Sequence, residues 1–262
     1  MNIIVCIKQV PDTTEIKIDP VKNTLIRTGV PSIMNPFDKN ALETGLQLKD
    51  TYGGKVTVIS MGPAQAKAVL REALAMGADE AYLVTDRAFG GSDTYATSYI
   101  LSQAIRKLGD FDVILGGKQA IDGDTGQTAP SIAEHLGAAR LTYVLDLKVE
   151  GDKVIARRQV EEGIEVVEAA LPVLCTATKE SNKPRYATIR GKLASLKAEI
   201  PEITLADLPA SDTSKMGLKG SPTKVKATFT PKRTANGVRI EGNSPADTAK
   251  TLLDKLAEAK IL

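Results

Sequence analysis

The first half of this 262-residue chain alternates short apolar runs, rich in β-branched residues, with longer segments whose apolar residues recur at helical spacing. The short runs predict four strands, over residues 2–7, 55–60, 81–85 and 111–115. The longer segments predict helices from Pro36 to about Lys49, from Pro63 to Gly77, over 94–108 and over about 129–136. Crossovers of this length join parallel strands and place helices on both faces of the sheet. We therefore expect an α/β fold with a doubly wound, mostly parallel, Rossmann-like sheet.

Two local features stand near the N-terminus. The apolar residues Ile16 and Ile18 on one side, and Leu25 and Ile26 on the other, flank a turn at 19–23, which is typical of a hairpin. Asn35 is the expected N-cap of the first helix, with Pro36 as its first residue. Asp38 follows in the first turn, where an acid suits the positive end of the helix.

The second half changes to the two-residue alternation of antiparallel strands. Residues 141–150 and 153–160 alternate apolar and polar side chains around a turn at 150–152, and 164–170 and 172–176 add further strands. These strands are expected to extend the parallel sheet.

From Pro201 onward, prolines become frequent and apolar residues come in short groups, until a final amphipathic helix near 245–260. This region is either a weakly ordered tail or an arm that buries its apolar groups on another subunit. We favour the arm because several of its residues are more apolar than disorder requires: Ile203, Leu205, Leu208, Phe229, Val238 and Ile240. The chain is thus expected to divide into an α/β domain over 1–200 and a C-terminal arm over 201–262.

Composition excludes several classes of function. The 34 Lys and Arg residues nearly balance 32 Asp and Glu, and aromatic residues make up only 4% with no Trp, so nucleic-acid binding is not expected. Cys6, Cys175 and His135 are too few for a disulfide scaffold or a common zinc site, and one His leaves few routes to a nucleophilic triad. No metal site and no catalytic side chain are expected.

The sequence has no apolar run that approaches the about 18 residues of a membrane-spanning helix, so membrane insertion is not expected. Its start, MNIIVCIKQVPD, lacks the charged leader and longer apolar core of a signal peptide. A soluble protein of the reducing cytoplasm is the simplest interpretation.

Ligands of doubly wound sheets bind at the carboxyl ends of the strands. Four segments fall at such ends: Cys6–Gln9, Ser60–Pro63, Gly90–Thr94 and Gly116–Thr128. The last is rich in glycine, which lets the backbone approach a ligand, and it offers hydroxyl and amide donors where a helix begins. This pattern suits a nucleotide diphosphate. It is equally compatible with a Gly/Asp-rich turn that precedes a capped helix.

Other motifs fit less well. There is no GxGxxG after a strand and no GxxxxGK[ST], so neither the common dinucleotide fingerprint nor the P-loop is present. DGDTGQ resembles part of a calcium loop, but Ala133 stands where the bidentate Glu is needed. Asp122 and Asp124 could form an acid pair, although turn formation is the favoured interpretation because no nucleophile or metal accompanies them. The basic stretch Lys179–Lys197 is either a solvated face or a docking site for an acidic partner.

Several motifs in one order resemble the β subunit of electron transfer flavoprotein. They are MNPF, MGPAQ, ALAMGADEA, GKQAIDGDTGQT and NKPRYAT, together with the stretch 156–176, ARRQVEEGIEVVEAALPVLCT. The resemblance covers about residues 1–200, and it departs from the family's signature where Cys175 replaces an aliphatic residue. It implies a heterodimer with an α subunit that holds a redox-active FAD. It also implies a pocket in the β subunit that holds AMP in conventional members and a second FAD in electron-bifurcating members.

Carried over by position, the resemblance implies a set of cofactor-binding residues: Cys6, Asn35, Pro36, Phe37, Asp38, Met61, Ser92, Thr94, Gly117, Lys118, Gln119, Ala120, Ile121, Asp122, Gly123, Asp124, Thr125, Gly126, Gln127 and Thr128. Asn35 would then serve both as helix cap and as nucleotide contact, while Cys6 and Met61 would be pocket walls or simply core. A loop over 185–194 would dock on acyl-CoA dehydrogenases through Arg185, Tyr186, Ile189 and Lys192, with Ile189 as the apolar anchor.

Two positions resemble the bifurcating branch in particular. Gly123 stands where conventional members carry a further acid, which leaves room for a ribityl diphosphate or nicotinamide. Ser92 and Thr94 add donors on the facing loop, although that loop can equally cap the next helix. Gln159 replaces an acid that faces the mobile domain of the partner in conventional members, which puts that contact in doubt.

The leading hypothesis is therefore a β subunit that, with its α subunit, oxidises NADH at a β-bound FAD. One electron would go to ferredoxin or flavodoxin, and the other, through the α-subunit FAD, to an acyl-CoA dehydrogenase. NADH oxidation is expected only in the complex, because the flavin and not a side chain carries the chemistry. The alternatives are a conventional electron carrier that binds AMP structurally and a free-standing adenine-nucleotide-binding module.

Overall fold

The computed structural model describes residues 1–12, 31–226 and 237–262, so the hairpin expected over 16–26 and Phe229 lie outside the described residues. The chain divides into two compact units, Met1–Lys226 and Ala227–Leu262. The first unit contains the sheet and all the segments expected at its carboxyl edge. The described part of the second unit contains the helix α7 (Pro245–Glu258), which begins at an N-cap formed by Ser244.

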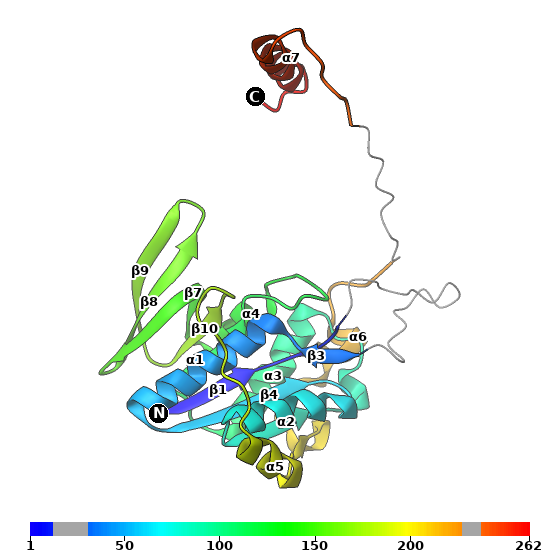
Figure 1. The fold of residues 1–262 in the computed structure, drawn as a ribbon. Helices are drawn as coiled ribbons and strands as arrows, with labels where there is room; N and C mark the ends of the chain where they lie inside the picture. The colour runs from blue at the N-terminus through cyan, green and yellow to red at the C-terminus, as the bar shows by residue number, and fades with distance from the viewer. Residues whose placement is uncertain (13–30, 227–236) are drawn as a thin grey trace. The chain divides into compact units, whose positions relative to one another are not determined.

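Within the described residues, nine strands form one sheet in the order β11-β5-β4-β1-β6-β10-β7-β8-β9 (Figure 1). Their bounds are β1 (Asn2–Cys6), β4 (Lys55–Met61), β5 (Glu80–Val84), β6 (Val113–Gly117), β7 (Ala139–Glu150), β8 (Lys153–Val160), β9 (Gly163–Ala170), β10 (Val173–Ala177) and β11 (Glu202–Ile203). The strands from β11 to β7 are parallel, and β8 and β9 continue antiparallel. A small antiparallel pair joins β2 (Gln9–Pro11) to β3 (Ser32–Met34). The expected α/β class with a mostly parallel sheet and added antiparallel strands is confirmed.

The helices of the first unit connect the strands and cover the sheet. They are α1 (Pro36–Tyr52), α2 (Lys67–Met76), α3 (Thr94–Leu108), α4 (Thr128–Leu136), α5 (Ile189–Lys197) and the short α6 (Gly217–Gly220). Short 3₁₀ turns are η1 (Ala64–Ala66), η2 (Arg87–Phe89), η3 (Leu205–Asp207) and η4 (Thr213–Lys215). The first helix runs one turn beyond the expected end at Lys49, and the strand expected at 111–115 begins two residues later.

Alternate residues of the central strands point into two separate cores. Val5, Val58 and Leu115 pack with the apolar faces of α1 and α2 on one side of the sheet. Ile4 and Ile114 pack with α3 and α4 on the other side. This two-sided burial explains why the parallel strands read as continuous apolar runs in the sequence.

Residues 201–226 belong to the first unit, so the compact part of the chain continues past the boundary expected at residue 200. Ile203 in β11 pairs with Val84 of β5, and both Ile203 and Leu208 are buried in the core on the α3 side of the sheet. Of the apolar residues that suggested an arm over 201–226, Ile203 and Leu208 are therefore buried by this chain itself, and Leu205 is partly buried against the same core. The segment that remains available as an arm begins at Ala227.

This assignment predicts a stability effect in the isolated chain. Ile203→Ala should lower the free energy of unfolding by about 2–4 kcal/mol, because it leaves a cavity in a core where Ile203 is 2% exposed. Val225→Ala is the control, since Val225 is 82% exposed and its loss should change stability by less than about 0.5 kcal/mol. Urea unfolding of the two variants measures the difference. Equal stabilities would contradict the placement of Ile203 in the core.

Candidate functional site

A cavity of about 850 Å³ lies at the carboxyl ends of β1, β4, β5 and β6. The strand order reverses at β1, because β4 and β5 follow on one side of it and β6 on the other, and this is where ligands of such sheets bind. All four expected segments contribute to the cavity wall, through Cys6–Gln9, Met61–Pro63, Gly90–Thr94 and Gly116–Thr128, with Ser60 and Ile121 as exceptions. The structure thus brings together segments that are far apart in the sequence.

Four of the expected cofactor-binding residues do not line the cavity: Asn35, Pro36, Phe37 and Ile121. Several lining residues were not anticipated, among them Thr85, Asp86, Thr97 and Thr223. Thr85 and Asp86 directly follow β5. The principle that ligands bind at the carboxyl ends of the strands could therefore have identified them from the sequence. Thr223 comes from the segment expected to be an arm, and no local pattern indicates its position.

Asn35 is the N-cap residue of α1, as expected, but its side chain makes no capping hydrogen bond. Its Nδ2 instead donates to the carbonyl of Gln119 at 2.8 Å, and its Oδ1 accepts from the amide of Ile121 at 3.2 Å. The fully buried Asn35 therefore holds the glycine-rich loop after β6 in place. It acts on the cavity through that loop.

Asp38 joins two walls of the cavity. Its carboxylate accepts from the amide of Lys8 at 2.7 Å and from the amide of Gly117 at 3.0 Å. Burial raises the pKa of Asp38 from 3.8 to about 7, although these hydrogen bonds and the charge of Lys8 oppose the rise. A side chain at Gly117 would collide with the Asp38 carboxylate and with Phe37. The close approach of β6 to α1 therefore requires glycine at this position.

The loop between β6 and α4 folds as a turn that is stabilised by the carboxylates of Asp122 and Asp124. Asp122 forms an ion pair with Lys8 at 2.6 Å, which links the loop to the segment after β1. Asp124 has a left-handed backbone, with φ of 54°. Its carboxylate accepts a hydrogen bond from the side-chain Nε2 of Gln119. The two carboxylates thus have separate partners, in agreement with turn formation. Gly123, between them, has no atom within 4 Å of the position that a Cβ would occupy.

The opposite wall is the loop between β5 and α3. Asp93 caps α3 by accepting from the amide of Ala96 at 3.0 Å, as expected for this segment. Ser92 Oγ donates to the carbonyl of Phe89 at 2.8 Å and accepts from the amide of Gly217 at 3.1 Å. The second oxygen of Asp93 accepts from the amide and hydroxyl of Thr223, at 2.9 and 2.7 Å. These contacts fasten residues 217–223 to the cavity wall.

The cavity offers binding groups rather than a nucleophile. Cys6 lines it, but burial, followed by the charge of Asp38, raises the pKa of the thiol to about 12, so it stays protonated at neutral pH. α3 and α4 both begin at the cavity, at Thr94 and Thr128. The Asp93 carboxylate caps α3, whereas α4 has no side-chain cap, so the free amides that attract anions lie at the start of α4. The arrangement suits a bound nucleotide whose phosphates lie near the start of α4.

Comparison with known proteins identifies the family. A sequence model of the electron transfer flavoprotein domain matches residues 22–208. The electron transfer flavoprotein subunit beta of Megasphaera elsdenii is 54% identical over 271 residues, which span 100% of both chains. The protein of the same name from Thermoanaerobacterium thermosaccharolyticum is also 54% identical over 100% of both chains. The caffeyl-CoA reductase-Etf complex subunit CarD of Acetobacterium woodii is 49% identical over the same share.

The chain belongs to the electron transfer flavoprotein family. It is a β subunit, and β subunits of this family pair with an α subunit, as the motifs in the sequence implied. No helix in the described parts of this β subunit is long and apolar enough to cross a bilayer.

The segment expected to dock on a partner lies away from the cavity and ends in α5. Tyr186 is 95% exposed and Ile189 is 82% exposed, and Leu193 and Leu196 continue the apolar stripe along α5. Arg185 differs, because its guanidinium is bound by Glu43 and Asp50 of the same subunit. The electron transfer flavoprotein β subunit thus presents an uncovered apolar face on this segment.

The raised pKa of Asp38 predicts how stability depends on pH. Because the folded-state pKa of about 7 lies above the ordinary value of 3.8, the protonated form favours folding. This contribution is complete below about pH 4 and is lost as the pH rises toward about 7, with a slope of at most about 1.4 kcal/mol per pH unit.

Asp38→Asn removes the titrating group and also leaves one of the two amides facing an NH₂ group, so the variant should be less stable. Urea unfolding from about pH 4.5 to about pH 7.5 measures the difference from wild type, which should shrink as the pH rises. A difference that is constant across this range would contradict a raised pKa at Asp38.

Proposed function

We propose that this chain is the β subunit of an electron-bifurcating electron transfer flavoprotein. Together with its α subunit it would oxidise NADH and divide the two electrons between ferredoxin or flavodoxin and, through the α-subunit FAD, an acyl-CoA dehydrogenase. The observation that carries the proposal is the 850 Å³ cavity, whose loop leaves open space at Gly123.

The cavity fits FAD in size and in its polar groups. Pockets for ligands of this kind have volumes of about 300–1,000 Å³. The amides at the start of α4, which has no side-chain cap, would hold the diphosphate, with the hydroxyls of Thr94, Thr125 and Thr128 beside them. When bound, FAD supplies hydride acceptance from NADH and the release of single electrons. The protein then has to position the cofactor and exclude water from it.

Several residues of this chain would set the shape of that site. Asn35 and Asp38 hold the loops on either side of the cavity, and the Lys8–Asp122 ion pair spans its edge. Cys6, protonated and apolar, would contact the cofactor without reacting with it. Each of these roles is positional, in keeping with a site where no side chain needs to act as acid, base or nucleophile.

The relatives support the proposed partners. The name of the Acetobacterium woodii relative joins an Etf to a reductase of a CoA ester, which favours a dehydrogenase of CoA esters as one partner. The exposed apolar stripe on α5 would be the surface that meets it. The α7 helix, with exposed Leu252 and Leu253, would be part of an arm on the α subunit.

Counting cofactors tests the proposal. The β subunit is co-expressed with its α subunit, and FAD and AMP are released from the purified heterodimer and quantified. Two FADs, one of them reduced directly by NADH, would support bifurcation. One FAD with one AMP would instead support a conventional electron carrier. A stable single chain without flavin would support a free-standing nucleotide-binding module.

The open space at Gly123 predicts a selective loss of cofactor. Gly123→Asp should fold, because no atom within 4 Å opposes the new Cβ, but it adds a charge beside the proposed FAD and should lower β-flavin occupancy. The α-subunit flavin should be retained. Gly123→Ala is the steric control and should have the smaller effect. Thr94→Val, which removes a hydroxyl from the facing wall, should act in the same direction as Gly123→Asp.

Flavin content per heterodimer and NADH-dependent bleaching measure the effect at Gly123. Full β-flavin occupancy in Gly123→Asp would contradict the assignment of the loop, and equal loss of both flavins would indicate misfolding.

The exposed position of Ile189 predicts a loss of docking. Ile189→Ala should raise the KM for the acyl-CoA dehydrogenase by about 10-fold, because anchors that fill a pocket on the partner dominate such interfaces. NADH oxidation by an artificial acceptor should be unchanged, because Ile189 does not line the cavity. Steady-state rates against dehydrogenase concentration give the KM. An unchanged KM would remove the docking role from this residue.

A further inference from the structure

We infer that Glu43 is a positioning residue for partner docking: it holds the segment that carries the exposed apolar stripe, and it does so from the helix that begins at the nucleotide cavity. The inference rests on the proposed docking role of this segment. It concerns residues 179–198, here called the docking segment, of which 179–188 have no regular secondary structure and 189–197 form α5.

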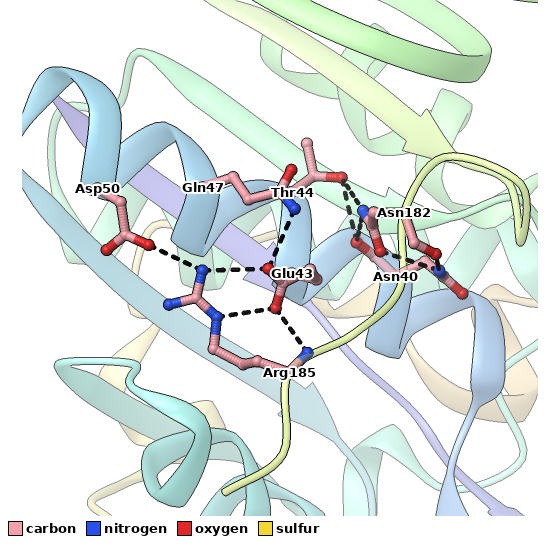
Figure 2. Close-up of polar contacts among 7 residues, drawn as sticks. All are labelled: Asn40, Glu43, Thr44, Gln47, Asp50, Asn182 and Arg185. Carbon is pink, nitrogen blue, oxygen red and sulfur yellow. Dashed lines mark hydrogen bonds and ion pairs between the residues drawn. The ribbon is translucent and has the colours of Figure 1, made fainter. Parts of the chain in front are cut away.

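Glu43 is buried in the second turn of α1, with a side chain only 5% exposed. It receives three hydrogen bonds from Arg185: from the backbone amide at 3.0 Å, from Nε at 2.9 Å and from Nη2 at 3.1 Å (Figure 2). Gln47 donates to the same carboxylate at 3.1 Å. Buried charges are retained where they are paired and fully hydrogen-bonded, and this carboxylate meets that condition.

Arg185 itself is fixed from two sides. Its Nη2 also donates to Asp50, at 2.8 Å, so the guanidinium spans two acids on one face of α1. The Glu43 hydrogen bond, followed by that of Asp50, raises the pKa of Arg185 against the effect of burial. The family resemblance implied that Arg185 is one of the residues that contact the partner. Its engagement inside the subunit assigns it to holding the segment instead.

A second anchor lies three residues before Arg185. Asn40 Nδ2 donates to the carbonyl of Asn182 at 2.9 Å, and Asn182 Nδ2 donates back to the carbonyl of Asn40 at 3.0 Å and to Thr44 Oγ1 at 2.9 Å (Figure 2). This reciprocal pair supplies hydrogen bonds to a stretch of backbone that belongs to no helix or strand.

The far end of the docking segment is held by α2. Arg71 Nη1 donates to the carbonyls of Ser195 at 2.6 Å and of Ala198 at 3.2 Å, near the C-terminal end of α5 where carbonyls lack partners within the helix. Gly191 lies against the carbonyl of Ala75, where any side chain would collide. α5 therefore has one orientation on α2, and its stripe of Ile189, Leu193 and Leu196 faces outward.

These contacts give the docking segment a fixed shape before any partner arrives. Ordering a loop on binding lowers affinity, so a preordered segment binds more tightly without new contacts at the interface. Glu43 contributes at the irregular part of the segment, where no backbone ladder would hold it otherwise. Its role is to position Tyr186 and Ile189, and it touches neither the partner nor the cofactor.

The test uses the purified heterodimer of this chain with its α subunit. Glu43→Gln keeps the shape of the side chain and removes its charge. The KM for the acyl-CoA dehydrogenase should rise on the order of 10-fold, a factor that corresponds to about 1.4 kcal/mol, while kcat is retained. Amide hydrogen exchange should become faster over 179–188 and remain unchanged in β1, β4 and β6. A general loss of structure would instead speed exchange in the strands as well as in residues 179–188.

Glu72→Gln is the matched control. It makes the same substitution in another carboxylate that bonds a side chain of α1, since Glu72 pairs with Lys39 at 2.6 Å. This carboxylate is 37% exposed, against 5% for Glu43, and it lies outside the docking segment. It should leave both KM and exchange unchanged, as expected of a surface ion pair. An effect of Glu72→Gln equal to that of Glu43→Gln would overturn the inference.

The remaining outcomes separate the inference from the proposed docking role. If Ile189→Ala raises the KM and Glu43→Gln does not, the positioning role of Glu43 is wrong and the docking role stands. If Ile189→Ala leaves the KM unchanged, the docking role fails and the inference fails with it. A raised KM in Glu43→Gln without faster exchange over 179–188 also overturns positioning.

A second variant guards against a failure of Glu43→Gln to assemble. Asn182→Ala removes the bonds that Asn182 Nδ2 makes to Asn40 and Thr44, keeps the bond from Asn40 Nδ2 to the carbonyl of residue 182, and uncovers no buried charge. It should raise the KM about threefold with the same local exchange pattern. An unchanged KM in this variant, in a heterodimer that assembles normally, would contradict the premise that the order of residues 179–188 sets the affinity for the partner, and the inference about Glu43 would fail with that premise.

Discussion

The position of β1 between β4 and β6 is the constraint on which the rest of the structure depends. Ile3–Cys6 pair in parallel with Val56–Ile59 on one side and with Val113–Gly116 on the other. The chain runs from β1 through α1 to β4 on one side, and from β5 through α3 to β6 on the other, with α1 and α3 on opposite faces of the sheet. The connecting loops therefore diverge at the carboxyl end of β1, and the cavity opens there. A hydrophobic strand buried on both faces therefore determines where polar loops can meet. The binding groups are a consequence of this pairing.

The helix α1 extends the effect of β1 to two surfaces. Its first turn carries Asp38, whose carboxylate joins the loop after β1 to the end of β6. Its next turns carry Asn40 and Glu43, which hold the docking segment. These three polar side chains are buried on a helix that otherwise packs against the sheet. One rigid element thus sets the geometry of the cavity and of a surface outside it, so that neither depends on a flexible loop for its position.

The sequence predicted the elements and the cavity well because both follow from local patterns. Hydrophobic periodicity locates strands and helices, and the rule of strand ends then locates a site. The errors arose where side chains bond across the fold. Asn35 stands at the expected N-cap position, yet its side chain bonds to residues 84 and 86 positions away instead of to the helix. Asp93 meets Thr223 across 130 positions, and Arg185 meets Glu43 across 142. No local pattern encodes such pairs.

Two glycines of the same loop illustrate how far a sequence can be interpreted and where the structure is needed. Gly117 and Gly123 look alike in a glycine-rich segment, and each could be assigned to close approach of a ligand. The fold itself requires Gly117, because a side chain there would displace Asp38 and Phe37. Gly123 has an ordinary backbone conformation and open space around it. Because folding makes no demand for glycine at 123, the space beside it is available to whatever the cavity holds, and Gly123 is the more informative of the two about the ligand.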